Sequence, residues 1–117
     1  MKTKATNRVD LMFRAFSDRT RLRILNLLRS GETCVCDIVE ILEAPQPTVS
    51  RHLAYLRRTG LVKARRDGAW MHYSLANPRD PFHRKLLECL DCCFNDVPQL
   101  ARDHKKLNRK NSRGCCG

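Results

Sequence analysis

Residues 33–60 read TCVCDIVEILEAPQPTVSRHLAYLRRTG. Thr33 suits the cap of a first helix, which ends before Pro45 because a residue that precedes proline disfavours the helical conformation. Pro47 suits the first turn of a second helix that continues to Gly60. Its buried stripe consists of Val49, Leu53 and Leu56. Two short helices joined by a tight connection over residues 43–46 predict a helix-turn-helix.

The flanking segments extend this arrangement on both sides. An apolar pattern from about residue 9 predicts one helix, and residues 18–30 predict another, with Ser17 as N-cap and Gly31 at its end. Residues 61–66 and 69–75 predict two strands around Asp67-Gly68, a dipeptide that suits the positive φ angles of a hairpin turn. A last helix is expected over about 82–97, and a weakly helical or disordered tail over 102–117. The predicted fold class is mainly α with a small β-hairpin, a winged helix-turn-helix.

Length and composition limit the class of protein. The chain has 117 residues, with 23 Lys and Arg against 12 Asp and Glu and a formal charge of +11. We expect one domain over residues 1–100, followed by a basic, cysteine-containing tail over 101–117. A domain this small is expected to form a homodimer, here through its terminal helices. The charge favours DNA as partner ahead of an anionic membrane surface, and the lack of a long apolar segment predicts a cytoplasmic protein.

The second helix of the motif carries polar side chains that suit the major groove. Glutamine can pair with adenine and arginine with guanine, so the candidates for base contacts are Gln46, Thr48, Ser50 and Arg51. His52 and Tyr55 belong to the same candidate DNA surface. The candidates for phosphate contacts, which give affinity but little sequence choice, are Arg57, Arg58, Lys63, Arg65 and Arg66.

The chain has seven cysteines, an odd number, and thiols in a reducing compartment more often bind metal, sense redox state or do chemistry than form a disulfide framework. Cys34 and Cys36 are predicted at about the first and third positions of their helix, where the helix dipole favours thiolates. On a regular helix the two side chains would point about 200° apart, so one soft ion could bind both only if that turn distorts. Such a distortion would lie just before the second helix of the motif, which is the recognition helix and is called the reading helix below. It would therefore couple ligand binding to DNA binding.

A second group of cysteines lies near the C-terminus. Cys89, Cys92 and Cys93 are spaced i, i+3 and i+4 on the last predicted helix and could hold an ion without unwinding it. The alternative for Cys89 and Cys93 is packing as small apolar residues in a dimer interface. Cys115 and Cys116 lie on the tail and could complete either thiol site.

Three motifs resemble the ArsR/SmtB family of metal-responsive repressors over about residues 8–76. They are Glu32-Thr-Cys-Val-Cys-Asp-Ile, Gln46-Pro-Thr-Val-Ser-Arg-His-Leu, and Gly60-Leu-Val followed by Arg66-Asp-Gly-Ala-Trp-Met-His-Tyr. The Cys-Val-Cys-Asp version is similar to the arsenic-sensing branch. The resemblance implies a homodimeric repressor of its own resistance operon that leaves DNA when the metalloid binds. Members of that branch often carry a third cysteine three residues after the second, where this chain has Val39.

The predicted function is therefore a repressor that leaves its operator when trivalent arsenic or antimony binds cysteine thiolates, with no organic cofactor. One alternative is a redox sensor, in which Cys89 and Cys92, or Cys34 and Cys36, form a reversible disulfide. Another is a sensor of zinc, cadmium or lead, and the residues considered for zinc are Asp80, His83 and His104. A thiol oxidoreductase is not expected, because the sequence lacks the βαβ pattern on which such enzymes place a Cys-x-x-Cys motif.

Overall fold

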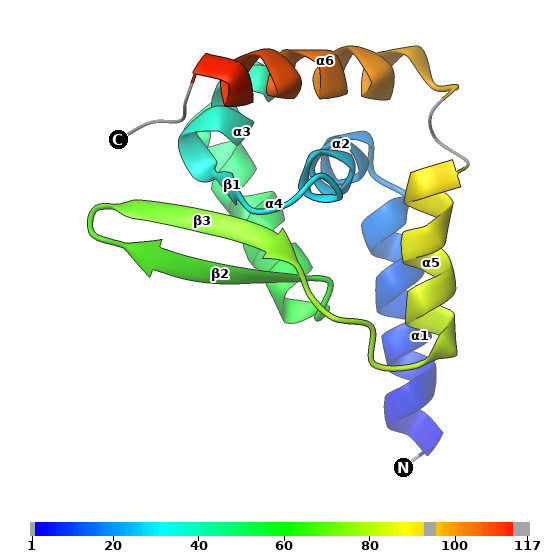
Figure 1. Cartoon of the computed structure of the whole chain (residues 1–117). Helices are drawn as coiled ribbons and strands as arrows, with labels where there is room; N and C mark the ends of the chain where they lie inside the picture. The colour runs from blue at the N-terminus through cyan, green and yellow to red at the C-terminus, as the bar shows by residue number, and fades with distance from the viewer. Residues whose placement is uncertain (1, 93–95, 114–117) are drawn as a thin grey trace.

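The computed structural model describes residues 2–92 and 96–113 (Figure 1). It confirms the predicted mainly helical fold with a small β-hairpin. The elements in chain order are α1 (Lys2–Phe16), α2 (Arg19–Leu28), β1 (Thr33–Cys34), α3 (Val35–Leu42), α4 (Gln46–Arg58), β2 (Val62–Asp67), β3 (Trp70–Leu75), α5 (Pro81–Cys92) and α6 (Pro98–Arg113). None of these helices is long and apolar enough to cross a membrane.

The start of α2 corrects one prediction. Its N-cap is Asp18, whose side chain accepts a hydrogen bond of 3.0 Å from the backbone N–H of Arg21. Ser17, the predicted cap, instead donates its hydroxyl to the carbonyl of Arg14 at 2.8 Å. A carboxylate at this position also complements the positive end of the helix dipole, which a hydroxyl does not do.

The start of α3 lies later than predicted. Thr33 and Cys34 form β1, which pairs antiparallel with Tyr73 and His72 of β3. Cys34 is the N-cap residue with an extended backbone (φ −70°, ψ 142°), so the helix itself begins at Val35. At the other end Glu43 takes the left-handed conformation and ends the helix, and α4 begins three residues later. The tight connection of the helix-turn-helix is thus confirmed.

The hairpin of β2 and β3 has the expected strands with a shifted turn. Asp67 pairs with Trp70, so the two turn residues are Gly68 and Ala69 instead of Asp67 and Gly68. Gly68 has a positive φ of 63°, whereas Ala69 does not. A glycine at the first turn position followed by an ordinary second residue is the pattern of a type II′ turn, which suits the twist of a hairpin. The complete sheet has the order β1-β3-β2.

The C-terminal part corrects a larger prediction. Instead of one helix over 82–97 and a weakly ordered tail, the chain forms α5 and a second helix, α6. Leu100, Asp103 and Leu107 of α6 are fully buried or nearly so. Figure 1 shows α6 lying across α2 and α3, while α5 runs beside α1. Cys93, Cys115 and Cys116 lie outside the described residues.

The core forms where α2, α3 and α4 meet. Its fully buried side chains include Ile24, Leu25, Ile38, Leu53 and Leu56. Burying one such side chain contributes about 1.5–3 kcal/mol, so this cluster provides the rigid support for the exposed face of α4.

Candidate nucleic-acid interface and thiol site

The outer face of α4 is polar and open to solvent. Val49, Leu53 and Leu56 are buried on the inner face and fix the orientation of the helix. The predicted DNA residues that lie exposed on α4 are Gln46, Ser50, Arg51, Arg57 and Arg58, whereas Thr48 is half-buried. Arg51, Arg57 and Arg58 place positive charge along this face. A polar, positively charged face of this kind suits a helix that enters the major groove of DNA.

Two predicted DNA residues of α4 instead contact α2. His52 and Tyr55 are half-buried, and the guanidinium of Arg21 lies 4.3 Å from the centre of the Tyr55 ring. Arg21 Nη1 also lies 3.4 Å from His52 Nδ1. Arg21 was not among the sequence candidates, because nothing in the spacing links it to a helix that begins 25 residues later. Its charge adds to the positive surface at the junction of α2 and α4.

The hairpin of β2 and β3 is the wing of the fold, and its three basic candidates for DNA contacts differ in their surroundings. Lys63 and Arg66 are exposed. Arg65 forms a two-pronged ion pair with Glu32, with N–O distances of 2.7 and 3.0 Å. The hydrogen bond from Arg65 lowers the pKa of Glu32, and the same bond raises the pKa of Arg65. A phosphate group must therefore compete with Glu32 for this guanidinium.

Cys34 and Cys36 lie together at the start of α3. Their sulfur atoms are 3.0 Å apart, and Cys34 is only 1% exposed. The expected opposite orientation is wrong because Cys34 precedes the helix in an extended conformation, which turns its side chain toward that of Cys36. Metal–sulfur bonds of about 2.3 Å reach sulfur atoms up to about 4.6 Å apart, so in the reduced protein one ion could bind both thiolates without unwinding α3.

A surface pocket of about 250 Å³ opens beside Cys36. Val35 and Val39 of α3 line it together with Gln46 of α4 and with Ala69 and Trp70 at the tip of the wing. Trp70 is a largely exposed aromatic residue, at 41%. One pocket thus joins a thiol, a candidate for base contacts and the wing. Within residues 2–92 and 96–113, no group of three or more Cys, His, Asp or Glu side chains is placed to hold a metal.

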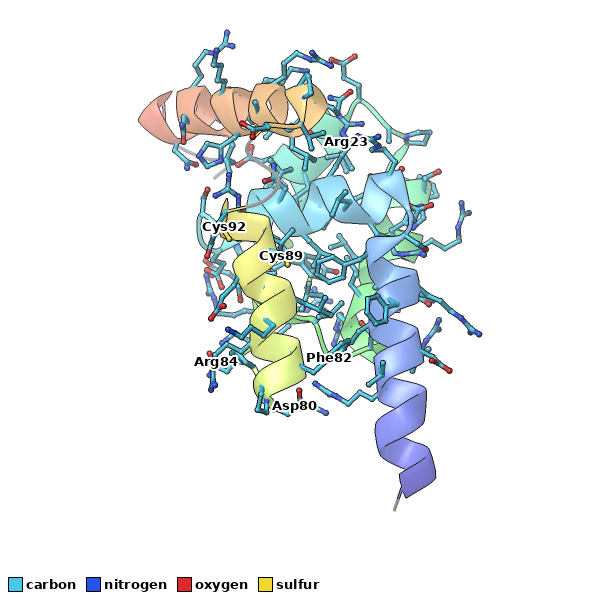
Figure 2. The ribbon with its side chains drawn as sticks, turned by 90° about the vertical axis from the view of Figure 1, so that its right-hand side faces the viewer. Arg23, Asp80, Phe82, Arg84, Cys89 and Cys92 are labelled. Carbon is cyan, nitrogen blue, oxygen red and sulfur yellow. The ribbon has the colours of Figure 1, made fainter. Side chains whose placement is uncertain are left out.

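The cysteines of α5 have different surroundings. Cys92 is exposed and donates its thiol to the carbonyl of Glu88 at 3.0 Å, whereas Cys89 is half-buried. Figure 2 shows both on the upper part of α5. This helix contacts α1, where the rings of Phe13 and Phe82 meet edge to face with their centres 5.3 Å apart.

The residues considered for zinc are not brought together. Asp80 caps α5 by accepting a 2.8 Å hydrogen bond from the backbone N–H of His83. His83 is buried, and its Nδ1 lies 3.0 Å from Arg8 Nη2. Burial lowers the pKa of His83, and the charge of Arg8 lowers it further. His104 lies elsewhere, 3.3 Å from the hydroxyl of Ser30.

Comparisons with known proteins agree with this geometry. Residues 18–64 match the model of the family described as bacterial regulatory protein, arsR family. An uncharacterized HTH-type transcriptional regulator of Methanocaldococcus jannaschii is 49% identical over 69 residues, which are 58% of this chain and 78% of that protein. The arsenical resistance operon repressor of Escherichia coli K12 is 39% identical over 105 residues, which are 88% of this chain and 87% of that protein.

A solved structure has the same fold. The homodimeric winged helix-turn-helix DNA-binding domain of Mb0332 from Mycobacterium bovis, described as a possible ArsR-family transcriptional regulator, superposes with a TM-score of 0.66. It is 28% identical, and the match covers 90% of this chain and 88% of that domain.

Proposed function

Since the chain belongs to the ArsR family of bacterial regulatory proteins, we propose that it represses transcription until trivalent arsenic binds Cys34 and Cys36. As a member of this family it is a DNA-binding transcriptional regulator and not an enzyme. The likeness to an arsenical resistance operon repressor supports arsenic as the inducer, because that likeness extends over 88% of this chain.

The observation that carries the proposal is the position of the thiol pair. The two sulfur atoms lie 3.0 Å apart and adjoin the pocket that Gln46 and Trp70 share. Soft thiolate ligands select soft, thiophilic ions, which favours arsenic, antimony or cadmium over hard cations. The pocket gives such an ion access to Cys36 from solvent.

The same position supplies a route from ligand to DNA. Cys34 belongs to β1 and pairs with His72 of β3, so it is joined to the wing, while Cys36 is in the helix that precedes α4. An ion bound to both fixes the wing and the start of the helix-turn-helix in one arrangement. If DNA requires another arrangement, a coupling free energy of about 1–3 kcal/mol lowers the affinity for DNA by about 5–150-fold.

A homodimer is part of the proposal, with α1 and α5 as its interface. Phe13 is 55% exposed on this surface. Arg8 Nε and Nη1 and His83 Nε2 are buried yet have no hydrogen-bond partner within the described part of the chain. A second subunit packed on α1 and α5 would cover the exposed ring of Phe13. Two reading helices in a dimer would then contact half-sites about one helical turn of DNA apart.

Within this dimer we assign two kinds of DNA contact. Gln46, Ser50 and Arg51 are exposed near the start of α4 and are proposed to contact base edges, with Thr48 beside them. The proposed phosphate contacts are Arg57, Arg58, Lys63, Arg65 and Arg66, while His52 and Tyr55 support α4 against α2.

The test is fluorescence anisotropy of the reduced protein on its own promoter DNA, titrated with arsenite. We expect arsenite to release the wild type and the control variant Cys92→Ser, whereas the double variant Cys34→Ser with Cys36→Ser stays bound. A wild type that ignores arsenite would contradict the inducer, and parallel titrations with antimonite and Cd²⁺ then identify the ion. Release of the double variant would place the sensing site elsewhere.

One second function has an observation in its favour. Sulfur atoms 3.0 Å apart are also well placed to form a reversible disulfide, which would make the protein a redox sensor. A redox sensor would release the promoter DNA when peroxide is added and bind it again after a dithiol reductant. It would not release the DNA when arsenite is added, which distinguishes this function from the first.

A further inference from the structure

The pocket beside Cys36 combines apolar walls with a pair of thiols at its edge. Val35 and Val39 of α3 are half-buried in one wall, and Ala69 and the exposed Trp70 form another at the tip of the wing. Figure 1 shows the hairpin of β2 and β3 extending beneath the start of α3, so two segments distant in the chain share this pocket. An apolar group that enters it removes the surface of an exposed tryptophan from water, which is favourable.

We propose that this pocket receives the organic group of a monosubstituted trivalent arsenical, while the arsenic itself binds Cys34 and Cys36. The inference rests on the proposed function and names the class of arsenical that the same site prefers. Phenylarsine oxide is the probe of this class, because its hydrated form carries one phenyl ring and two hydroxyl groups on arsenic.

The thiol pair matches the number of groups that such a molecule exchanges. For each As–S bond that forms, one As–O bond breaks, and the thiol proton leaves with the hydroxide as water. Two thiols of the reduced protein therefore release two waters, the As–C bond stays intact and arsenic stays trivalent. The sulfur atoms are 3.0 Å apart, within the about 4.6 Å that two bonds of about 2.3 Å can span.

The different burial of the two cysteines directs the organic group. Cys34 is 1% exposed, whereas Cys36 lines the pocket. An arsenic atom that bridges the two sulfur atoms therefore has the buried Cys34 on its inner side. Its third substituent lies on the outer side, where the pocket begins.

The pocket has room for one aromatic ring. Its volume is about 250 Å³, and an apolar cavity of about 150 Å³ already binds benzene. A phenyl group in this space contacts the valine side chains of α3 and the ring of Trp70, and aromatic pairs gain free energy beyond the area that they bury. Arsenite presents a hydroxyl group to the same apolar walls and gains neither contribution. The pocket thus favours a substituted arsenical over inorganic arsenite.

The organic group also lies between two parts of the molecule that are assigned to DNA. Gln46, a proposed base contact at the start of α4, lines the pocket together with Trp70 of the wing. A ligand shifts a conformational equilibrium only through the difference in its affinity for the two states. A ring packed between the reading helix and the wing adds contacts that depend on their relative position. The organic group therefore adds to the coupling between ligand and DNA.

The first experiment compares arsenite with phenylarsine oxide on the full-length protein bound to promoter DNA. The protein is reduced with a phosphine, because dithiol reductants bind arsenic themselves. We expect Trp70→Ala to need at least about tenfold more phenylarsine oxide for half-release than the wild type, with its arsenite requirement unchanged. Trp70→Phe keeps an aromatic ring and should lie between the two. Arsenite is the matched control because it uses the same thiols, and a normal arsenite response also shows that the variant is folded.

The second readout observes the pocket directly in the absence of DNA. Trp70 is the only tryptophan of the chain, so the intrinsic fluorescence of the protein reports on this side chain. Bound phenylarsine oxide should protect Trp70 from quenching by acrylamide, whereas bound arsenite should leave the quenching unchanged.

The outcomes separate the two proposals. If Trp70→Ala shifts the response to both ligands equally or to neither, or if phenylarsine oxide leaves Trp70 open to acrylamide, the pocket does not hold the organic group and the thiol site still stands. If the double variant Cys34→Ser with Cys36→Ser still responds to phenylarsine oxide, the proposed function itself is overturned.

Discussion

Helices α5 and α6 follow the wing in sequence, yet they are attached to the molecule in opposite ways. Asp103 of α6 is fully buried against Arg23 of α2, with N–O distances of 2.8 and 3.0 Å. The corresponding pair of α5 joins Asp91 to Arg29 at 3.7 Å, and the Asp91 side chain is 68% exposed. A buried ion pair therefore holds α6 against α2, whereas the ion pair between α5 and α2 is exposed, and α5 packs into the core through the fully buried Leu90.

This difference separates the two groups of cysteines. Lys110 of α6 contacts Asp37 of α3 at 3.4 Å, and the pocket beside Cys36 in the same helix is shared with α4 and the wing. Cys89 and Cys92 lie on α5, which packs against α1 through Phe82 and Phe13 and contacts α2 through Asp91 and Arg29. The contrast explains why we assign sensing to α3, and each prediction below tests one side of it.

The largest expected effect is on stability. Asp103→Asn removes the charge that balances the partly buried Arg23, and such a loss costs about 3–5 kcal/mol in the free energy of unfolding. The matched control is Asp91→Asn on α5. The exposed ion pair between Asp91 and Arg29 contributes at most about 1 kcal/mol to the free energy of unfolding. Urea denaturation followed by circular dichroism measures both. Equal losses for the two variants would contradict the different attachment of the two helices.

The next effect concerns the accessibility of the thiols. In the reduced, DNA-free protein, iodoacetamide should modify Cys92 at least about tenfold faster than Cys34, because Cys34 is 1% exposed and Cys92 is exposed. A tenfold ratio corresponds to a local opening free energy of about 1.4 kcal/mol. Mass spectrometry of the digested protein gives the rate at each site. Comparable rates would mean that the start of α3 opens as readily as the surface of α5.

The helix-turn-helix and the wing could be predicted from sequence because their signals are local. Pro45 and Pro47 mark the connection, and the apolar stripe of α4 has an unbroken helical period. Other features depend on partners distant in the chain. Cys34 is extended because it pairs with His72, and Asp103 is buried because Arg23, 80 residues earlier, neutralises it. Among the residues of α6 whose burial is described, Leu100 and Leu107 are the large apolar side chains that are buried, and a sequence this polar is typical of a solvated tail.

The sequence suggests Cys34 and Cys36 as a thiol site but does not predict their geometry, for the same reason. The sequence placed Cys34 inside a regular helix, where the two thiols would point apart. Only the pairing of β1 with β3 turns them together at 3.0 Å. The pocket with Trp70 likewise requires the wing to be placed against α3, which no local pattern of either segment indicates.

The smallest expected effect is a pH dependence near neutrality that arises from His83 of α5. Burial, and then the charge of Arg8, lower the pKa of His83 below its ordinary value of 6.5, so the folded state takes up this proton at a lower pH than the unfolded chain. As the pH falls through 6.5, the unfolded chain takes up a proton before the folded chain does, and the free energy of unfolding decreases. The variant His83→Gln should therefore lose less thermal stability than the wild type between about pH 7.5 and 5.5.

The matched control for this measurement is His104→Gln, which changes a histidine of α6 and leaves His83 in place. Its melting temperature should fall with pH as steeply as that of the wild type. Lys110, which helps to hold α6, stays charged throughout this range because the ordinary lysine pKa of 10.5 lies far above it, and the hydrogen bond with Glu40 raises that pKa further. If His83→Gln and the wild type lose stability in parallel, the attachment of α5 is as insensitive to acid as that of α6. The contrast between the two helices would then rest on burial alone.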